Sequence, residues 1–534
     1  LWWYCRGSSP HSDQYAACNS GTAQKTDNIV ITFSEPVTVV EPWFNITCGT
    51  SGTHTAVVSD ADPVFTLNPE TDFVVGETCT VTIDNAGVND DDADDAIADY
   101  MLEDYVFSFT VVTGCGDTYT FIYDIQGTGA TSPVVGQNVT TEGVVVGDFQ
   151  VGGKNGYYIQ EPNADADPLT SDGLFVYNTT VAVNVGDRVR VTGLITEWAT
   201  GTGGTLTELT PTSPASSNVL LCSTGNTVAA TEVTLPVTAV NDFEKYESML
   251  VTFPQSLIIS EYFNFDRYGE IVLTSTRHMT PTALVEPGAP AQAEAAAYLL
   301  DRITLDDGRT TQNPDPAIHP NGLIFTMENL FRGGGTVTGV TGILDFYQSL
   351  YRVQPTFGAT YENANPRTEA PEITEADLKV TSFNVLNYFV TLDDGVNDIC
   401  GPSGTMECRG ADDAEEFARQ KAKILSALDI IDADIFGLME IENDSPISGN
   451  DAVADLVAGL NAINGEGTYA YIITGAIGGD AIKQAILYKP ASVTPVGEFQ
   501  ILDSSVDPRF IDTANRPALA QAFMDNATGD EFVV

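Results

Sequence analysis

The sequence predicts a multidomain protein in which several β-rich modules precede an α+β domain. The chain has 534 residues, which suggests three to four domains at about 150 residues each. Short segments of alternating polar and apolar residues, separated by turn residues, fill most of residues 28–366, as in the strands of sandwiches and barrels. After residue 378, strand-like and helix-like stretches alternate, which is typical of a sheet layered with helices.

Residues 1–113 are predicted to form a β-sandwich. The strings NIVITFSEPVTVV, HTAVVSD, CTVTID and YVFSFTVV read as short strands with turn residues between them, a spacing typical of two packed sheets. The acidic string NDDDADD, Asn89 to Asp95, could bind calcium through its oxygens. It lacks the glycine and the terminal glutamate of an EF-hand loop, so a solvated acidic loop is the favoured interpretation.

Two further β-rich modules are expected before the α+β domain. Residues 115–222 contain strand-like strings with glycine turns, including GDRVRVTG, and we expect a small closed barrel of the OB type. Tyr157 and Tyr158 could stack on single-stranded nucleic acid, but few basic residues accompany them, so a structural role is favoured. Residues 223–366 read as a second β-domain with a helical insert, AQAEAAAYLLDRI, and residues 367–377 read as a polar, proline-containing linker.

The charge of the chain limits the possible partners. The net charge is −52, from 74 acidic and 22 basic residues. Nucleic-acid-binding proteins normally carry a basic footprint, so this composition argues against a simple polyanion binder. High salt would screen the repulsion, because the Debye length falls to about 3 Å at 1 M, and a bound metal ion would add positive charge locally. Acidic surfaces favour solubility, and we expect a salt-adapted, secreted or cell-surface protein; an ordinary acidic surface is the alternative.

The cysteine pattern predicts disulfide bonds. Eight cysteines are scattered in pairs through β-rich segments, with no CxxC string and no zinc-like spacing, as in proteins of oxidising compartments; free buried thiols are the alternative. The expected pairs are Cys48 with Cys79, Cys115 with Cys222, Cys400 with Cys408, and Cys5 with Cys18. No apolar run is long enough to cross a membrane. The first residues read neither as a signal peptide nor as an initiator methionine start, so we expect a mature product or a fragment.

Two polar residues end predicted strands of the α+β domain. LKVTSFNVLNYF and ADIFGLME read as strands, and DDAEEFARQKAKILSALDII reads as a helix between them, capped by Asp412 or Asp413. Asn384 and Glu440 fall at the ends of the two strands. Since chemistry gathers at the carboxyl ends of strands in α/β sheets, an amide and a carboxylate would meet there if the strands are neighbours, and such oxygens suit magnesium. The alternative is that Glu440 caps a loop and Asn384 makes a turn.

The strings SFNVLNYF, GLMEIEN, GDAIKQAILYKP and NRPALAQAF, in this order, resemble the endonuclease/exonuclease/phosphatase superfamily. The best match is to its large secreted bacterial endonucleases of the ExeM and NucH type, which the upstream strings YDIQGTGATSPVVGQNVTTEGVVVGDFQ and GYYIQEP also resemble. This resemblance covers roughly residues 115–534. The strings FSEPVTVV and FTLNPETDFVVGETCTVTI resemble the Ig-like modules of bacterial surface proteins.

The resemblance implies roles for four residues. Asn384 matches an active-site asparagine, and Glu440 matches the glutamate that binds the catalytic ion, which would be Mg²⁺, with Mn²⁺ or Ca²⁺ possible. Arg516 matches an arginine that contacts substrate phosphate, and a guanidinium grips phosphate bidentately. Asp480 lies where the family often has an acid that supports a catalytic histidine. Glu442, two residues after Glu440, is not a ligand in this pattern.

The resemblance also implies a four-layer αββα nuclease sandwich, of which residues 378–534 would be the N-terminal half. The family's catalytic histidines would follow the strand that NRPALAQAF begins, whereas the four histidines of this chain are His11, His54, His278 and His319. We therefore expect this chain to be a C-terminally truncated fragment of a longer protein. Without a general acid or base, this fragment is expected to be inactive on its own.

The function expected of the parent protein is that of a secreted, metal-dependent endonuclease. It would hydrolyse phosphodiester bonds of extracellular DNA, and of RNA as a further substrate, as a monomer without a membrane span. A phosphatase or lipid phosphodiesterase of the same fold is one alternative, because a small or zwitterionic substrate meets less repulsion. The other is a non-enzymatic array of β-modules that binds a surface or matrix.

Overall fold

The computed structural model describes residues 21–33, 36–61, 63–90, 103–165, 167–199, 201–373, 376–444 and 452–534. Cys5, Cys18 and residues 91–95 of the predicted acidic loop lie outside the described residues, while Asn89 and Asp90 belong to a strand. The chain divides into two compact units, residues 1–366 and 367–534. Within the described residues, no helix is long and apolar enough to span a membrane.

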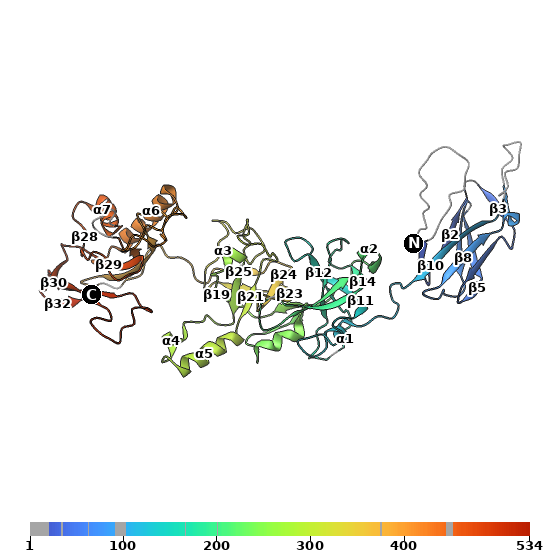
Figure 1. Cartoon of the computed structure of the whole chain (residues 1–534), viewed down its shortest axis with the longest axis horizontal. Helices are drawn as coiled ribbons and strands as arrows, with labels where there is room; N and C mark the ends of the chain where they lie inside the picture. Colours follow the sequence, from blue (N-terminus) through green and yellow to red (C-terminus); the bar gives the residue numbers. More distant parts are fainter. Residues whose placement is uncertain are drawn as a thin grey trace. The chain divides into compact units, whose positions relative to one another are not determined.

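The first module of unit 1 is a β-sandwich (Figure 1). Its strands are β1 Gly21–Gln24, β2 Ile29–Thr32, β3 Val37–Val39, β4 Phe44–Cys48, β5 Gly52–His54, β6 Ala56–Ala61, β7 Val64–Pro69, β8 Thr78–Ile83, β9 Val88–Asp90 and β10 Tyr105–Val112. They form a sheet of order β1-β10-β8-β4-β5, a sheet of order β2-β7-β6 and the pair β3–β9. Alternate residues of β8 are buried and pack with Trp43, Phe65 and Phe109 in one core, which explains the period of two in the sequence.

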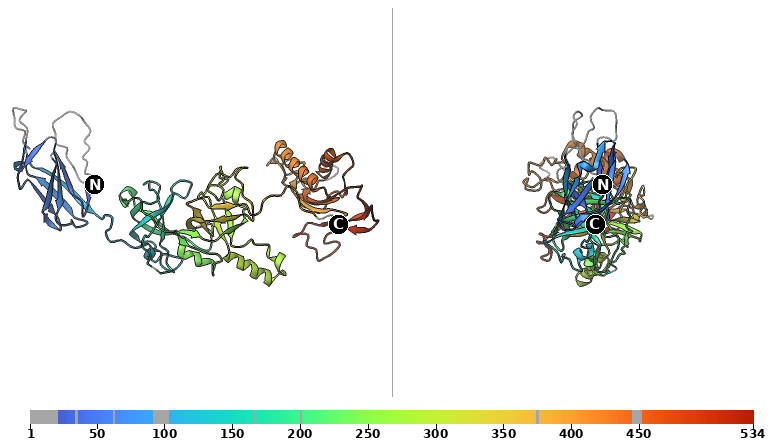
Figure 2. Two further views of the ribbon diagram at one scale, coloured as in Figure 1. Left: turned by 180° about the vertical axis from the view of Figure 1, so that it is seen from behind. Right: turned by 90° about the vertical axis from the view of Figure 1, so that its right-hand side faces the viewer.

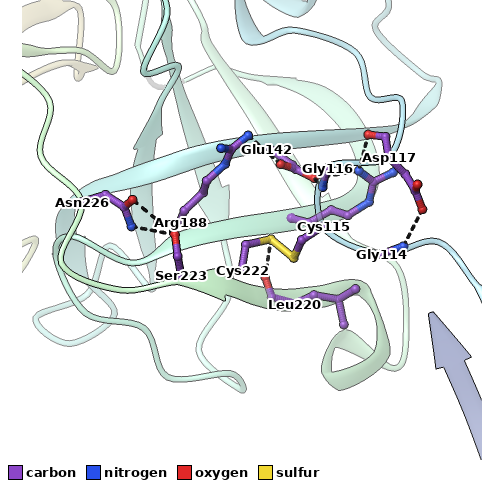
Figure 3. Close-up of a disulfide and its surroundings, with 11 residues drawn as sticks. Gly114, Cys115, Gly116, Asp117, Glu142, Arg188, Leu220, Cys222, Ser223 and Asn226 are labelled. Atoms are coloured by element: carbon purple, nitrogen blue, oxygen red, sulfur yellow. Dashed lines mark hydrogen bonds and ion pairs between the residues drawn. A yellow bond between two sulfur atoms is a disulfide. The ribbon is translucent and has the colours of Figure 1, made fainter. Parts of the chain in front are cut away.

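The second module is a closed sheet. Its strands are β11 Asn138–Phe149, β12 Gly156–Gln160, β13 Gly173–Tyr177, β14 Arg188–Trp198, β15 Leu206–Pro211 and β16 Val219–Ser223. Strand β11 pairs with both β12 and β14, which closes the order β11-β12-β13-β15-β14, and β13 runs parallel to β15. The short helices α1 Ile122–Gln126 and α2 Ala215–Asn218 accompany it. Figure 3 shows the Cys115–Cys222 disulfide, which joins the start of this module to β16.

The third module is a nine-stranded sheet of order β17-β18-β23-β24-β21-β20-β19-β22-β25. Its strands are β17 Thr231–Glu232, β18 Leu250–Phe253, β19 Leu257–Glu261, β20 Ile271–Thr274, β21 Ile303–Leu305, β22 Thr336–Thr338, β23 Val340–Tyr347, β24 Leu350–Pro355 and β25 Thr360–Glu362. Its helices are η2 Val240–Tyr246, α3 Phe265–Tyr268, α4 Pro281–Leu284 and α5 Ala289–Leu300. Buried polar contacts join it to the closed sheet, including the ion pair of Lys154 with Asp345 at 2.5 Å.

Unit 2 has three layers. Its strands are β26 Val380–Tyr388, β27 Ile435–Glu442, β28 Ala470–Tyr471, β29 Ile482–Tyr488, β30 Val493–Leu502, β31 Ala518–Asp525 and β32 Glu531–Val533. A four-stranded sheet of order β26-β27-β29-β28 carries helices α6 Ala414–Ile431 and α7 Ala452–Asn464 on one face. The sheet β30-β31-β32 packs against the other face through Ile435, Ile486, Val493 and Phe523. Figure 1 shows the helices on one side of β29, and Figure 2 shows this layer from behind.

Local sequence explains where α6 begins and ends. The Asp413 carboxylate accepts hydrogen bonds from the backbone N–H groups of Glu415 and Glu416, both at 2.9 Å, so Asp413, one of the two residues predicted, is the N-cap. The helix ends at Ile431, and its C-cap Asp432 has a left-handed φ of 50°. Ile424 and Leu428 are its buried residues, and they pack against Phe436 and Leu438 of β27.

The described cysteines form the three expected disulfides. Cys48 bonds Cys79, Cys115 bonds Cys222, and Cys400 bonds Cys408. Cys48 and Cys79 are facing residues of β4 and β8.

We predict that Leu438→Ala destabilises unit 2 by about 2–5 kcal/mol, because it removes a fully buried side chain and leaves a cavity. Leu438 is 1% exposed. Leu386→Ala is the matched control, since that leucine is 72% exposed. Native-state hydrogen exchange of β27 peptides in the whole chain measures the opening free energy. Equal exchange in the two variants would contradict this account of the core.

Candidate functional site

Asn384 and Glu440 lie where the regular pairing of two adjacent parallel strands is interrupted, and not at the strand ends expected from the sequence, because β26 continues to Tyr388 and β27 to Glu442. β26 pairs in parallel with β27, and Asn384 is the Cα partner of Met439, the residue before Glu440. With neighbouring strands about 4.8 Å apart and a rise of about 3.3 Å per residue, the Cα atoms of Asn384 and Glu440 are roughly 6 Å apart. Both residues therefore lie at the same edge of the sheet.

Both strands are irregular at this edge. The pairing of β26 with β27 shifts register between Asn384 and Tyr388, and that of β27 with β29 shifts between Leu438 and Ile441. Left-handed φ angles occur at Leu386 (51°), Asn387 (53°) and Glu440 (62°). Such a conformation in a residue other than glycine costs on the order of 1–3 kcal/mol. A bulge re-aims the side chain that it carries, so this strain is concentrated where the orientation of Asn384 and Glu440 is set.

Local hydrogen bonds hold the bulge of β26. The Asn384 side-chain oxygen accepts from the backbone N–H of Leu386 at 2.7 Å. Gln420 of α6 donates to the carbonyl oxygen of Leu386 at 2.9 Å. The exit of β26 is thus tied to the helix layer, and the exposed Asn384 side chain has a fixed orientation.

The two glutamates at the end of β27 have different environments. Glu442 is 2% exposed, and its Oε2 accepts hydrogen bonds from the backbone N–H groups of Val390 and Thr391 at 2.8 and 3.2 Å. It therefore fixes the segment that follows β26. The half-buried Glu440 carboxylate makes no hydrogen bond or ion pair with any described residue. Glu442 thus has the capping role, and Glu440 remains available to a ligand.

The donors at this edge fit magnesium in number and kind. Mg²⁺ is typically bound through one or two carboxylates, and it keeps several waters or takes substrate phosphate oxygens. Glu440 offers an unpaired carboxylate. The Asn384 oxygen has a second lone pair beside its bond to Leu386. Among the described residues, the one group of three side chains that could together hold a metal ion is Cys48, Glu77 and Cys79. Its two sulfurs are joined in a disulfide, so this group does not compete with Glu440 for the ion.

Asp480 and Arg516 are in direct contact. The Arg516 Nε donates to Asp480 Oδ2 at 2.7 Å, and Arg409 Nη2 lies 3.0 Å from Asp480 Oδ1. Partial burial acts to raise the pKa of Asp480, but the bond from Arg516, the backbone N–H of Ala481 and the two guanidinium charges outweigh it and hold the pKa below its ordinary value. Among the described residues, Arg516 Nη1 and Nη2 have no hydrogen-bond partner. They are available to an anion.

Two residues that the sequence analysis did not single out position this pair. Asn443 is fully buried, donates to the carbonyl oxygens of Ile477 and Asp480 at 2.8 Å, and accepts from Ile477 N–H at 2.9 Å. Arg409 directly follows the disulfide of Cys400 and Cys408. The two cysteines pack with Ala481 and Ile482, next to Asp480. Two features of the sequence could have pointed to these residues: Asn443 ends the string GLMEIEN, and Arg409 follows Cys408, a cysteine expected to form a disulfide.

Gln484 is a third residue that the sequence analysis missed. It lies on β29 between Lys483, which pairs with Ile441, and Ala485, which pairs with Leu438. It therefore faces the bulge that carries Glu440. Its Oε1 is buried without a hydrogen-bond partner, which adds an unpaired oxygen opposite the bulge. No sequence signal marks it, because its role depends on the register of β27 against β29.

Comparisons with known proteins identify the N-terminal module. Residues 14–111 match the family model of the bacterial Ig-like domain. The N-terminal module is Ig-like. No curated protein matches the chain.

Solved structures resemble part of the chain. An endonuclease/exonuclease/phosphatase family protein from Bacteroides thetaiotaomicron is 20% identical, with a TM-score of 0.20, over 29% of this chain and 48% of that one. The corresponding protein from Bacteroides vulgatus is 16% identical, with a TM-score of 0.19, over 29% and 50%. A mannosyl-6-phosphatase from Bacteroides thetaiotaomicron is 21% identical, with a TM-score of 0.20, over 29% and 49%. This chain therefore spans about half the length of these structures.

The two glutamates give a matched test of this site. We predict that Glu442→Ala destabilises unit 2 by about 2 kcal/mol, because two backbone N–H groups lose their acceptor. Glu440→Ala should change stability by less than about 0.5 kcal/mol, as at sites without partners. Hydrogen exchange of residues 388–392 and of β27 measures both effects. Equal destabilisation by the two substitutions would contradict the division of roles.

The lowered pKa of Asp480 predicts a pH dependence. A carboxyl whose pKa is lower in the folded state stabilises the fold above its unfolded pKa, and this contribution disappears as the pH falls through its folded pKa. The melting temperature of unit 2 should therefore differ most between the wild type and Asp480→Asn at neutral pH, with the difference shrinking below about pH 4. Calorimetry from pH 7 to pH 3 measures this. A difference that does not vary with pH would refute the assignment.

Proposed function

We propose that unit 2 is the metal-binding part of a magnesium-dependent phosphodiesterase, an endonuclease that cleaves extracellular DNA and, as a further substrate, RNA. One observation carries this proposal: Glu440, whose carboxylate has no partner among the described residues, is one register position from Asn384, where the regular pairing of two adjacent parallel strands is interrupted. The ordered strings that resemble the endonuclease/exonuclease/phosphatase superfamily support it. If unit 2 belongs to that superfamily, its three layers would be part of a four-layer sandwich. For the closed sheet of unit 1 we propose an OB-type module.

Each residue of the site has a chemical role in this proposal. Glu440 and Asn384 would hold the divalent ion, with Mn²⁺ or Ca²⁺ as possible substitutes for Mg²⁺. Bound there, the ion would polarise a phosphoryl oxygen and balance the charge that develops in the transition state. Arg516 would bind the phosphate through its terminal nitrogens, while Asp480 holds Arg516 and Arg409 in place. To form a hydrogen bond with a catalytic histidine, Asp480 would have to lose its contact with Arg516 or with Arg409.

The residues of unit 2 do not supply a complete catalytic set. Residues 367–534 contain no histidine, and lysines or carboxylates in ordinary environments are poor proton donors and acceptors near pH 7. We therefore propose that residues 1–534 alone bind the ion but turn over little or no substrate.

A phosphatase or a lipid phosphodiesterase of the same fold is the second candidate. The net charge of −52 favours it, since a long polyanion meets more repulsion than a small phosphoester. The arginines of the site and bound metal ions would offset this repulsion only locally. The disulfides and the Ig-like module are compatible with an extracellular or surface location for either candidate.

Plasmid DNA and sphingomyelin distinguish the two candidates. We predict that the natural full-length protein nicks plasmid DNA in the presence of Mg²⁺, and that Glu440→Ala lowers the rate about a hundredfold or more, because metal ions supply several kcal/mol of transition-state stabilisation. Glu498→Ala is the matched control, since that glutamate is exposed on β30. Cleavage of sphingomyelin alone would favour the second candidate. Full activity of Glu440→Ala would refute the metal-binding role of Glu440, and a wild-type protein that cleaves neither substrate would favour the non-enzymatic array of β-modules.

A further inference from the structure

A second pair of carboxylates lies at one end of the closed sheet of unit 1. Strands β12 and β13 end their pairing at Gln160 and Gly173, and the backbone N–H of Glu161 donates to the carbonyl oxygen of Asp172 at 2.9 Å. Glu161 and Asp172 are therefore the next facing pair of this hairpin. Facing residues of antiparallel strands carry their side chains on the same face, with Cβ atoms about 5 Å apart.

The pair faces the interior of the closed sheet. Ile159 and Leu174, two residues away on each strand, belong to its apolar core, and the period of two places Glu161 and Asp172 on the same face. Glu161 is 2% exposed and Asp172 is 8% exposed. Glu161 Oε2 and Asp172 Oδ1 are buried without a hydrogen-bond partner. Two buried carboxylates side by side are costly unless a cation or a proton neutralises them.

No basic side chain among the described residues is paired with these two carboxylates. Arg188, whose charge reaches Glu161, donates instead to Glu142 at 2.8 Å, and Figure 3 shows it turned toward that residue. Tyr119 OH donates to Glu161 Oε1 at 3.5 Å. Burial raises the pKa of Glu161 to about 7 and that of Asp172 to about 6, and the charge of Asp165 also raises the latter.

The stretch from Glu161 to Asp172 has a calcium-like spacing. Side-chain oxygens occur at its first, third, fifth, seventh and twelfth positions: Glu161, Asn163, Asp165, Asp167 and Asp172. These are positions that supply ligands in the twelve-residue calcium loop of EF-hands. Here the loop joins two strands rather than two helices, and its sixth residue is alanine rather than glycine.

We propose that Glu161 and Asp172 bind a calcium ion that closes this end of the sheet. Asp165, whose carboxylate accepts hydrogen bonds from Asp167 N–H and the Thr170 hydroxyl, would add negative charge near the ion rather than a third ligand. Calcium accepts six to eight oxygen ligands in flexible geometry, including backbone carbonyls, whereas magnesium demands a near-ideal octahedron. The ion would neutralise the buried pair. The proposal is independent of the function proposed for unit 2.

Terbium luminescence tests this site in the whole chain. Tb³⁺ replaces Ca²⁺ among oxygen ligands, and nearby tyrosine sensitises its emission; Tyr119 contacts Glu161, and the charges of Glu161, Asp165 and Asp172 all act on Tyr123. We expect tyrosine-excited Tb³⁺ emission that Ca²⁺ displaces, and binding roughly tenfold or more weaker in Glu161→Gln/Asp172→Asn. Glu232→Gln, at an exposed glutamate of β17, should keep the wild-type affinity.

Calorimetry keeps the test independent of how the variant folds. Ca²⁺ should raise the melting temperature of the wild-type chain, because a ligand that binds only the folded state stabilises it, and EGTA should reverse the rise. The double variant should lack this response. Equal terbium affinity in the wild type and the double variant would overturn the proposal. So would a wild-type chain that shows neither Ca²⁺-displaceable emission nor a Ca²⁺-dependent melting temperature.

Discussion

The parallel pairing of β26 with β27 is the constraint on which the candidate site depends. It places Asn384 against Met439, and the two bulges that follow then set the directions of Asn384 and Glu440. The rest of unit 2 supports this pairing: α6 and α7 cover one face of the sheet, and β30–β32 cover part of the other. A slip of one residue would exchange the two faces of a strand and would move Glu440 away from this edge.

Carboxylates in this very acidic chain differ mainly in how each is neutralised. Glu442 is held by backbone N–H groups, and Asp480 is held by two arginines. Glu440 has no partner among the described residues, and Glu161 and Asp172 share a buried end of the closed sheet. A divalent cation binds most favourably at unpaired or crowded buried carboxylates, because it replaces an unfavourable electrostatic interaction with a favourable one. This contrast, rather than the net charge, selects the candidate metal sites.

The sequence predicted strand and helix positions well where hydrophobic period and caps act locally. The N-cap Asp413, the alternation in β8 and the two strands that carry Asn384 and Glu440 follow from such signals, whereas the adjacency of those strands was only a condition of the prediction. Arg409, Asn443 and Gln484 were missed, because their roles arise from contacts between segments far apart in the chain. The left-handed conformation of Glu440 was also unpredictable, since glutamate has no preference for it and tertiary pairing imposes it. The contact of Asp480 with two arginines likewise depends on how the Cys400–Cys408 loop packs.

Crystals of the chain soaked in Mn²⁺ would show whether an ion binds between Asn384 and Glu440, because anomalous scattering locates the ion without reference to activity. We expect an anomalous peak at bonding distance from the Glu440 carboxylate, on the side of the strand that faces Asn384, and no such peak in crystals of Glu440→Ala. A fully ordered Glu440 with Mn²⁺ bound only elsewhere, or side chains of Asn384 and Glu440 that point to opposite faces of the sheet, would contradict it.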